Sequence, residues 1–147
     1  MEKIIHSMIR VIDLEKSMKF YEDVLGLKET HRLDFPDFAL VYLKNADNDF
    51  EIELTLNKGR SEPYTHGTGY GHIGVVVTDA AAKHAALTAA GYECAAVKEF
   101  KRGDELLARF FFIQDPDGYK IEMLERHGRY QRHTTLARPG KRCSNLP

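Results

Sequence analysis

Apolar and polar positions recur along the chain in two similar blocks. The first block opens with a mostly apolar stretch at residues 4–12 followed by Asp13, and the second opens with apolar residues 73–77 followed by Asp79. Each Asp stands where a helix N-cap is expected, because its carboxylate can accept a hydrogen bond from a free amide of the first helical turn. Both blocks are therefore predicted to begin with a strand that leads into a helix.

The two predicted helices have matching lengths. The first carries apolar residues at helical spacing and has Gly26 as a C-terminal stop. Those apolar residues are Leu14, Met18, Tyr21 and Leu25. The second, at residues 80–90, is rich in Ala, is expected to bury Leu87, and stops at Gly91. The repeat thus extends through both helices.

Segments rich in β-forming residues follow each helix. Residues 38–43 correspond to residues 109–114, and residues 50–56 correspond to residues 119–124. The last two segments of the second block are separated by Asp-Pro-Asp-Gly at 115–118, a sequence that favours a tight turn. The pattern predicts an α+β chain in which a strand–helix–strands unit occurs twice, with an offset of 65 to 69 residues.

The domain boundaries follow from this repeat. The units meet at residues 58–69, which are rich in Gly and Pro. We expect a single domain at 1–126, with module one at about 1–62 and module two at about 67–126. Residues 127–147 are predicted to form a basic, flexible tail.

Composition and charge exclude several classes of protein. A chain of 147 residues with 43% hydrophobic residues can form one sizeable core, which argues against disorder. It has no apolar run of about 20 residues to span a membrane, and its N-terminus has no apolar region typical of a signal peptide. Its two cysteines form no Cys-x-x-Cys pair. A cytoplasmic location is therefore expected.

The net charge of −1 conceals an uneven distribution. Residues 126–147 hold six of the 21 basic side chains and no acidic one, so the remainder of the chain carries 15 basic and 22 acidic side chains. A basic tail could be a nucleic-acid arm, but isolated charges among Gly, Pro, Ser and Thr are more typical of a solvated terminus. With an acidic body, nucleic acid is not an expected partner.

Each module places one His early in its first strand and one Glu in its last strand. These residues are His6 and Glu53 in module one and His72 and Glu122 in module two. Two imidazoles and two carboxylates suit a divalent transition metal. A pseudo-twofold relation between the modules could bring the four side chains to one point. Strand alternation would place Arg10 on the face of His6.

Each of these residues also has an ordinary structural explanation. A single His on a strand is more often a hydrogen-bonded structural residue than a ligand, and a Glu on an amphipathic strand usually faces solvent. Repetition favours a site, because both residue types recur at matching positions and both Glu have apolar neighbours that would make an unpaired carboxylate costly. The other histidines are not repeated in this way, and we expect them on the surface. They are His31, His66, His84, His127 and His133.

Several segments of the sequence are similar to the motifs of a known protein family. They are residues 6–11, 17–27, 52–57 (Ile-Glu-Leu-Thr-Leu-Asn), 69–73 and 112–122. Together they closely resemble the glyoxalase I family of the vicinal-oxygen-chelate superfamily, over about residues 4–125. The first-helix phrase and the Asp-Pro-Asp-Gly turn are shared across the superfamily and indicate the fold alone. The phrase from Glu53 to Asn57 is more specific, since related dioxygenases and thiol transferases typically use two His and one Glu, and related epimerases often have Gln in place of Glu53.

The resemblance implies tandem βαβββ modules with a sheet curved around a metal site. It also implies a homodimer in which His6 and Glu53 of one chain meet His72 and Glu122 of the other. Nickel or cobalt is favoured over zinc, because the chain lacks the N-terminal segment and insertions of longer zinc-type relatives. Zinc remains open, since these ligands alone do not select among the ions.

The implied reaction converts the hemithioacetal of methylglyoxal and glutathione to S-lactoylglutathione, which detoxifies methylglyoxal. The metal would act as a Lewis acid, with Glu122 as the base and Glu53 acting on the other substrate epimer. Arg10 and Asn57 would contact glutathione. Some relatives have Arg where this chain has Thr68, and a basic residue among 98–102 is expected to replace it.

Other functions stay open at this stage. The chain could be another metalloenzyme of the superfamily, acting as a dioxygenase, epimerase or thiol transferase. It could also be a resistance protein that sequesters a ligand without catalysis, although such a pocket would need no metal. The thiol itself is open too, because trypanothione would also require cationic anchors.

Overall fold

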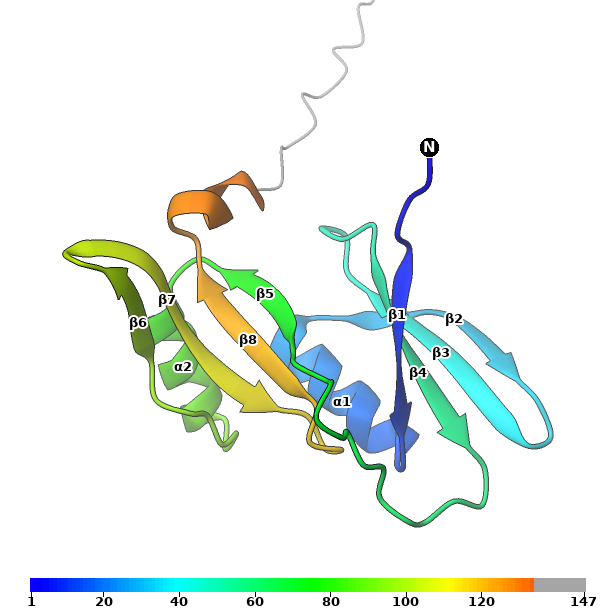
Figure 1. The fold of residues 1–147 in the computed structure, drawn as a ribbon. Coiled ribbons are helices and arrows are strands. Elements are labelled where there is room, and N and C mark those ends of the chain that lie inside the picture. The colour runs from blue at the N-terminus through cyan, green and yellow to red at the C-terminus, as the bar shows by residue number, and fades with distance from the viewer. Residues whose placement is uncertain (134–147) are drawn as a thin grey trace, which may run out of the picture.

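The computed structural model describes residues 1–133 and consists of two copies of one unit (Figure 1). The first module contains β1 (His6–Val11), α1 (Leu14–Leu25), β2 (Lys28–Asp34), β3 (Phe38–Lys44) and β4 (Glu51–Asn57). The second contains β5 (Ile73–Val77), α2 (Ala80–Ala89), β6 (Lys98–Arg102), β7 (Glu105–Gln114) and β8 (Lys120–Glu125). The short 3-10 helix η1 (Gly128–His133) follows.

Each module forms its own four-stranded sheet, and the two strand orders correspond. They are β1-β4-β3-β2 and β5-β8-β7-β6, with the first and last strands of each module paired in parallel and the other pairs antiparallel. The α+β class and the tandem βαβββ modules are thereby confirmed. The curved sheet is not closed within residues 1–133, because the edge strands β1 and β5 belong to different sheets (Figure 1).

Both helices begin where the sequence predicts. Asp13 accepts a hydrogen bond from the Lys16 amide at 3.0 Å, and Asp79 accepts one from the Ala82 amide at 2.9 Å. Gly26 ends α1 in the left-handed conformation, with φ of 66°, which glycine adopts without steric cost. The buried face of α1 differs slightly from the expected stripe, and consists of Leu14, Ser17, Phe20, Tyr21 and Val24.

The two modules share one hydrophobic core. The inward faces of both sheets and both helices contribute to a single cluster of buried side chains, among them Leu54 and Val41 from the first sheet and Phe111 and Met123 from the second. Alternate strand residues point away from this cluster, as the two-residue period of a strand requires. The outward faces of the sheets are therefore left for other contacts.

Polar contacts also join α1 to the Asp-Pro-Asp-Gly turn of the second module. The Tyr21 hydroxyl donates to Asp115 at 2.9 Å, and Asp117 accepts from the Ile12 amide at 3.1 Å and from the Ser17 hydroxyl at 3.3 Å. Tyr21 and Asp115 are both buried. Burial raises the pKa of the Asp115 carboxyl, and burial together with the Asp115 charge raises the pKa of Tyr21. The turn thus connects the two modules.

Replacing Tyr21 with Phe should weaken this connection. The substitution removes the hydroxyl donor and leaves the buried Asp115 carboxylate with fewer hydrogen bonds, so the free energy of unfolding should fall by about 1–3 kcal/mol. Tyr92→Phe is a matched control, because the Tyr92 hydroxyl donates to the exposed Asp23 at 2.7 Å, and its loss should cost less than about 0.5 kcal/mol. Urea denaturation at a fixed protein concentration measures both. Equal losses would contradict the assigned role of Tyr21.

A short helical turn follows the second sheet at the start of the C-terminal region. Residues 128–133 form η1, and residues 134–147, which make up most of the predicted tail, lie outside the described part. A backbone hydrogen bond of 3.0 Å from the Tyr130 amide to the His127 carbonyl holds this turn. Within residues 1–133 no helix is long and apolar enough to cross a membrane.

Candidate functional site

The first predicted His and Glu lie together on the outward face of the first sheet. His6 stands at the start of β1, and Glu53 lies in the parallel neighbour β4, opposite Met8. The His6 Nε2 atom is 3.1 Å from a carboxylate oxygen of Glu53. The side chain of His6 is 37% exposed and that of Glu53 is 10% exposed, so the imidazole remains reachable from solvent while the carboxylate is covered.

Hydroxyl groups surround the Glu53 carboxylate. Thr55 donates to it at 3.3 Å from the same face of β4. Tyr42 lies opposite Glu53 on β3, and burial, followed by the negative charge of Glu53 and a hydrogen bond to it, raises the pKa of this tyrosine. Tyr42 therefore stays a neutral donor at physiological pH. The Glu53 carboxylate is fixed by its partners as well as by His6.

The second pair repeats this arrangement with fewer partners. His72 immediately precedes β5, and its Nε2 atom is 3.0 Å from a carboxylate oxygen of Glu122 in β8. The imidazole meets the Phe112 ring edge-on, with centroids 5.3 Å apart. Among residues 1–133 no hydroxyl group is hydrogen-bonded to Glu122. Its carboxylate therefore has fewer hydrogen-bond partners than that of Glu53.

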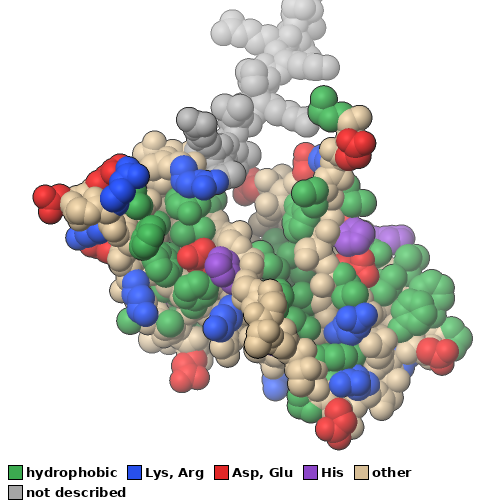
Figure 2. Space-filling model, viewed as in Figure 1, with side chains coloured by type: hydrophobic (Ala, Val, Ile, Leu, Met, Phe, Trp, Pro, Cys, Tyr) green, Lys and Arg blue, Asp and Glu red, His purple; other side chains and the backbone are tan. Residues whose placement is uncertain are grey.

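The two pairs do not meet within one chain. Over residues 1–133 no group of three or more His, Cys, Asp or Glu side chains is close enough to hold a metal, so the expected convergence on one point does not occur within the chain. Figure 2 shows histidines beside acidic side chains in separate places on the two halves of the molecule. Neither Glu53 nor Glu122 has a Lys or Arg partner among the described residues. Each module therefore offers one imidazole and one carboxylate, and the carboxylate is not neutralised by a Lys or Arg side chain of the described residues.

The predicted substrate anchors lie on the same face as the first pair. Register places Arg10 opposite Thr55, so the exposed guanidinium side chain shares the face of Glu53. Asn57 lies at the end of β4, and its side-chain amide donates to the Tyr64 hydroxyl at 2.8 Å. Sequence reasoning missed Tyr64, which comes from the connection between modules, as well as Thr55 and Tyr42. Strand alternation places Thr55 on the face of Glu53, because it lies two residues later, but assigns no role to its hydroxyl group.

Two hollows accompany the modules. The larger, about 1220 Å³, runs between α1 and β5 and contains none of the six predicted site residues. The smaller, about 760 Å³, includes His72 and Phe112 in its walls, with Tyr70, Tyr92 and Lys120 beside them. Its volume lies within the range of small-molecule sites, about 300–1,000 Å³. The smaller hollow is therefore the one associated with the candidate chemistry.

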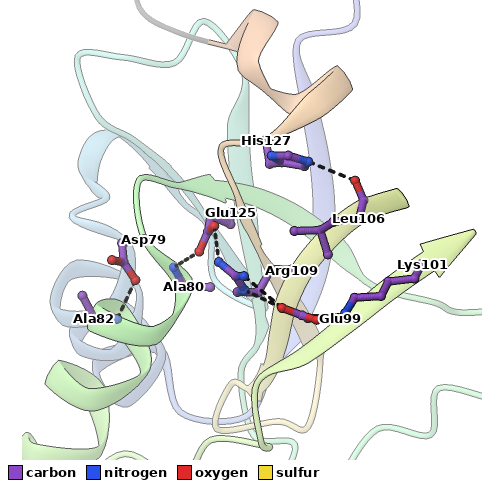
Figure 3. A network of polar contacts seen from close by, with 9 residues as sticks. All are labelled: Asp79, Ala80, Ala82, Glu99, Lys101, Leu106, Arg109, Glu125 and His127. Carbon is purple, nitrogen blue, oxygen red and sulfur yellow. Dashed lines mark hydrogen bonds and ion pairs between the residues drawn. The ribbon is translucent and has the colours of Figure 1, made fainter. Parts of the chain in front are cut away.

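A polar network on the second module holds its strands in place (Figure 3). Glu125 accepts from the Ala80 amide at the start of α2 at 3.1 Å and from Arg109 at 2.8 Å, and Arg109 also donates to Glu99 in β6. Glu99 is paired in turn with Lys101 at 2.7 Å. These contacts connect α2, β6, β7 and β8, and so stabilise the strand that carries Glu122.

The other histidines are less uniformly exposed than expected. His31 is exposed, but the Nε2 atoms of His66 and His84 are buried and have no hydrogen-bond partner. The His66 ring stacks on Tyr119 with centroids 4.1 Å apart, and His127 is hydrogen-bonded to the Leu106 carbonyl at 2.9 Å. The surface prediction is wrong for His66 and His84, because aromatic neighbours cover rings that the sequence pattern gave no reason to bury.

Comparisons with known proteins agree with the fold. Residues 3–123 match the family described as the glyoxalase/bleomycin resistance protein/dioxygenase superfamily. A lactoylglutathione lyase of Haemophilus influenzae is 40% identical over 128 residues, covering 84% of this chain and 92% of the relative. A lactoylglutathione lyase of Neisseria meningitidis serogroup A is 38% identical over 129 residues, covering 84% of this chain and 91% of the relative.

Solved structures show the same relationship. The trypanothione-dependent glyoxalase I of Leishmania major superimposes with a TM-score of 0.69 at 32% identity, covering 85% of this chain and 87% of that one. Glyoxalase I from Zea mays superimposes with a TM-score of 0.74 at 28% identity, covering 86% of this chain and 45% of that one.

Proposed function

The chain belongs to the glyoxalase/bleomycin resistance protein/dioxygenase superfamily, and on this basis we propose that it is a lactoylglutathione lyase. It converts the hemithioacetal of methylglyoxal and glutathione to S-lactoylglutathione. Identity of 38–40% to relatives with this name, over most of both chains, supports the activity. The observation that carries it is the pair of His–Glu contacts, one on the outward face of each sheet.

These donor groups fit a divalent metal ion. His6 and Glu53 would hold it from one side, and His72 and Glu122 from the other. The fit rests on imidazole nitrogen donors beside carboxylates that have no Lys or Arg partner among the described residues. When bound, the ion would supply Lewis acidity that makes a proton on the neighbouring substrate carbon easier to remove.

Glu122 is the proposed base. Its carboxylate takes the proton from one carbon of the hemithioacetal and returns it to the adjacent carbon, which yields a thioester without net oxidation. The contact with His72 orients it, and the absence of a hydroxyl partner in the described chain leaves its second oxygen available to the substrate. The Phe112 ring packs edge-on against one side of His72.

The first module would provide the second carboxylate and the substrate anchors. Glu53 is held by Thr55 and Tyr42, and is proposed to act on the other epimer of the hemithioacetal. Arg10 suits a carboxylate of glutathione because a guanidinium can donate two hydrogen bonds to it. Asn57 is proposed to contact glutathione as well, with its carbonyl oxygen and its second amide proton.

The complete site is proposed to form between two chains. Each module offers only two protein ligands, and the pairs are separate within residues 1–133. In a twofold homodimer, module one of each protomer could face module two of its partner and so form two equivalent sites. The outward sheet faces, which carry both pairs, are the surfaces available for this contact.

We assign the enzyme to the cytoplasm, which agrees with a free Cys94 in the described residues. The thiol is proposed to be glutathione. Trypanothione is the alternative with specific support, because the Leishmania major relative is described as dependent on it.

Turnover tests the function directly. Purified protein with a divalent metal should form a thioester, followed by its ultraviolet absorbance, when given methylglyoxal and glutathione. Parallel reactions with trypanothione identify the thiol. Tight binding of a ligand by metal-free protein without turnover would instead indicate a sequestering resistance protein. Turnover of neither adduct by metal-loaded protein would exclude the proposed reaction.

Metal removal should abolish this activity reversibly. Dialysis against a chelator removes the ion that the His and Glu side chains are proposed to hold, so turnover should fall below about 1% of the initial rate, consistent with loss of the Lewis acid. Restoration should be greater with nickel or cobalt than with zinc. Elemental analysis before and after dialysis measures occupancy. Full activity in protein shown to be metal-free would contradict the proposed centre.

A further inference from the structure

Lys120 occupies a distinctive position beside the second His–Glu pair. It is the first residue of β8, two residues before Glu122, so both side chains point to the same outward face of the sheet. The parallel register of β5 and β8 pairs Ile73 with Ile121, which places Lys120 beside His72. Its side chain lines the hollow of about 760 Å³ that His72 also lines.

Lys120 is exposed and has no ion-pair or hydrogen-bond partner within residues 1–133. Three other cations of the second module are already paired. Lys101 contacts Glu99 at 2.7 Å, Arg102 contacts Glu105 at 2.7 Å, and Arg109 bridges Glu99 and Glu125. Two of the basic residues expected to replace the missing arginine at position 68 are thus engaged with carboxylates of their own chain.

Lys98 is the remaining unpaired cation of residues 98–102 in the described structure. It pairs in register with Phe110 and so shares the outward face, but it lies on the edge strand β6, two strands away from β8. Neighbouring strands are about 4.8 Å apart, so Lys98 starts roughly 10 Å from the strand of Glu122. Lys120 starts on that strand itself.

The other charged groups that line this hollow do not neutralise Lys120. Glu93 is exposed and forms no ion pair with it, and the Asp115 carboxylate is turned to Tyr21 and to the amides of Asp117 and Tyr119. Aromatic side chains of Tyr70, Tyr92 and Phe112 form much of the remaining wall. The hollow therefore combines one free ammonium group with aromatic side chains next to a proposed metal ligand.

We propose that Lys120 binds a carboxylate of the thiol part of the substrate and so contributes to its recognition. This inference rests on the proposed lyase function. Lys120 would take over the task of the cation that position 68 lacks, holding one end of the adduct while Glu122 acts on the reacting carbons. An ammonium–carboxylate contact is a charge-assisted hydrogen bond, among the stronger single contacts available to a flexible ligand.

Kinetics and direct binding of Lys120→Ala test the proposal. The KM for the glutathione hemithioacetal and the dissociation constant of S-methylglutathione should both rise about 10-fold, whereas kcat should change less than about two-fold. Lys120→Arg should restore most of the affinity. Lys16→Ala is the matched control, because Lys16 is an exposed lysine on α1 outside the site, and it should leave both constants unchanged.

Esterified ligands identify the contact. Two monoesters of S-methylglutathione, one blocked at the glycine carboxylate and one at the γ-glutamyl carboxylate, are compared on wild type and Lys120→Ala. The ester that lacks the contacted group should bind both proteins equally, as expected when ligand and residue share one interaction. An undiminished 10-fold difference with both esters would overturn the proposal. So would a loss of kcat at unchanged KM, or a full effect from Lys98→Ala with none from Lys120→Ala.

The binding measurement separates this inference from the lyase function. If wild type binds S-methylglutathione and Lys120→Ala does not, the contact is supported even in a protein that fails to turn over the hemithioacetal. Normal turnover with unaltered affinity in Lys120→Ala would overturn the contact and leave the lyase function intact. Absence of both binding and turnover in wild type would overturn both.

Discussion

Glu122→Gln is expected to reduce kcat by about 10²–10⁴-fold, the usual effect of losing a general base. Gln keeps the shape of the side chain and one coordinating oxygen, so metal content should stay close to that of wild type. The KM should change little, because the substitution leaves Arg10, Asn57 and Lys120 in place. Steady-state kinetics together with elemental analysis on the same preparation measure these quantities.

Glu53→Gln provides the matched comparison, since it makes the same chemical change in the other module. The hydroxyl groups of Thr55 and Tyr42 are hydrogen-bonded to the Glu53 carboxylate, whereas no hydroxyl group of residues 1–133 is hydrogen-bonded to Glu122. We therefore expect Glu53→Gln to retain turnover of one hemithioacetal epimer. If Glu53→Gln lost activity while Glu122→Gln kept it, the base would lie on the first module and the assignment would be reversed.

Local features of the fold could be predicted from the sequence because each depends on a few neighbouring residues. Asp13 and Asp79 cap their helices as expected, and Gly26 ends α1. Internal repetition then predicted both modules. The separation of the eight strands into two open sheets could not be predicted from strand patterns, because alternation fixes the faces of a strand and does not identify its neighbours.

Some contacts of the site could also be predicted from the sequence, and others could not. Contacts within one sheet, such as His6 with Glu53, follow from residues that share one face of neighbouring parallel strands, here two register positions apart. Tyr64 could not be anticipated, because it belongs to the connection between modules, where no periodic pattern restricts its position. The stacking of His66 on Tyr119 likewise depends on packing between distant segments. The relative position of the two His–Glu pairs depends on a second chain in the proposed dimer. The sequence of one chain could suggest such a shared site only through its resemblance to a known family.

Mixed dimers should recover activity from two inactive variants if sites form between chains. His6→Ala inactivates module one and Glu122→Ala inactivates module two, so each homodimer has a lesion in both sites. A heterodimer places both lesions in one site and leaves the other intact. Random reassociation gives half heterodimers, and about one quarter of the wild-type activity should return, as twofold symmetry requires.

Two further mixtures of variants test whether each site combines module one of one chain with module two of the other. His6→Ala mixed with Glu53→Ala should recover nothing, because both lesions lie in module one and every heterodimer site then receives one of them. His6→Ala mixed with His72→Ala should recover the same quarter as the first mixture. Recovery is measured by thioester formation after the two variants are unfolded and refolded together. Suppose that His6→Ala stayed inactive when mixed with Glu122→Ala or with His72→Ala, while wild type refolded normally under the same conditions. Each site would then have to be built within a single chain, and the two His–Glu pairs would have to approach each other by rearrangement of the modules.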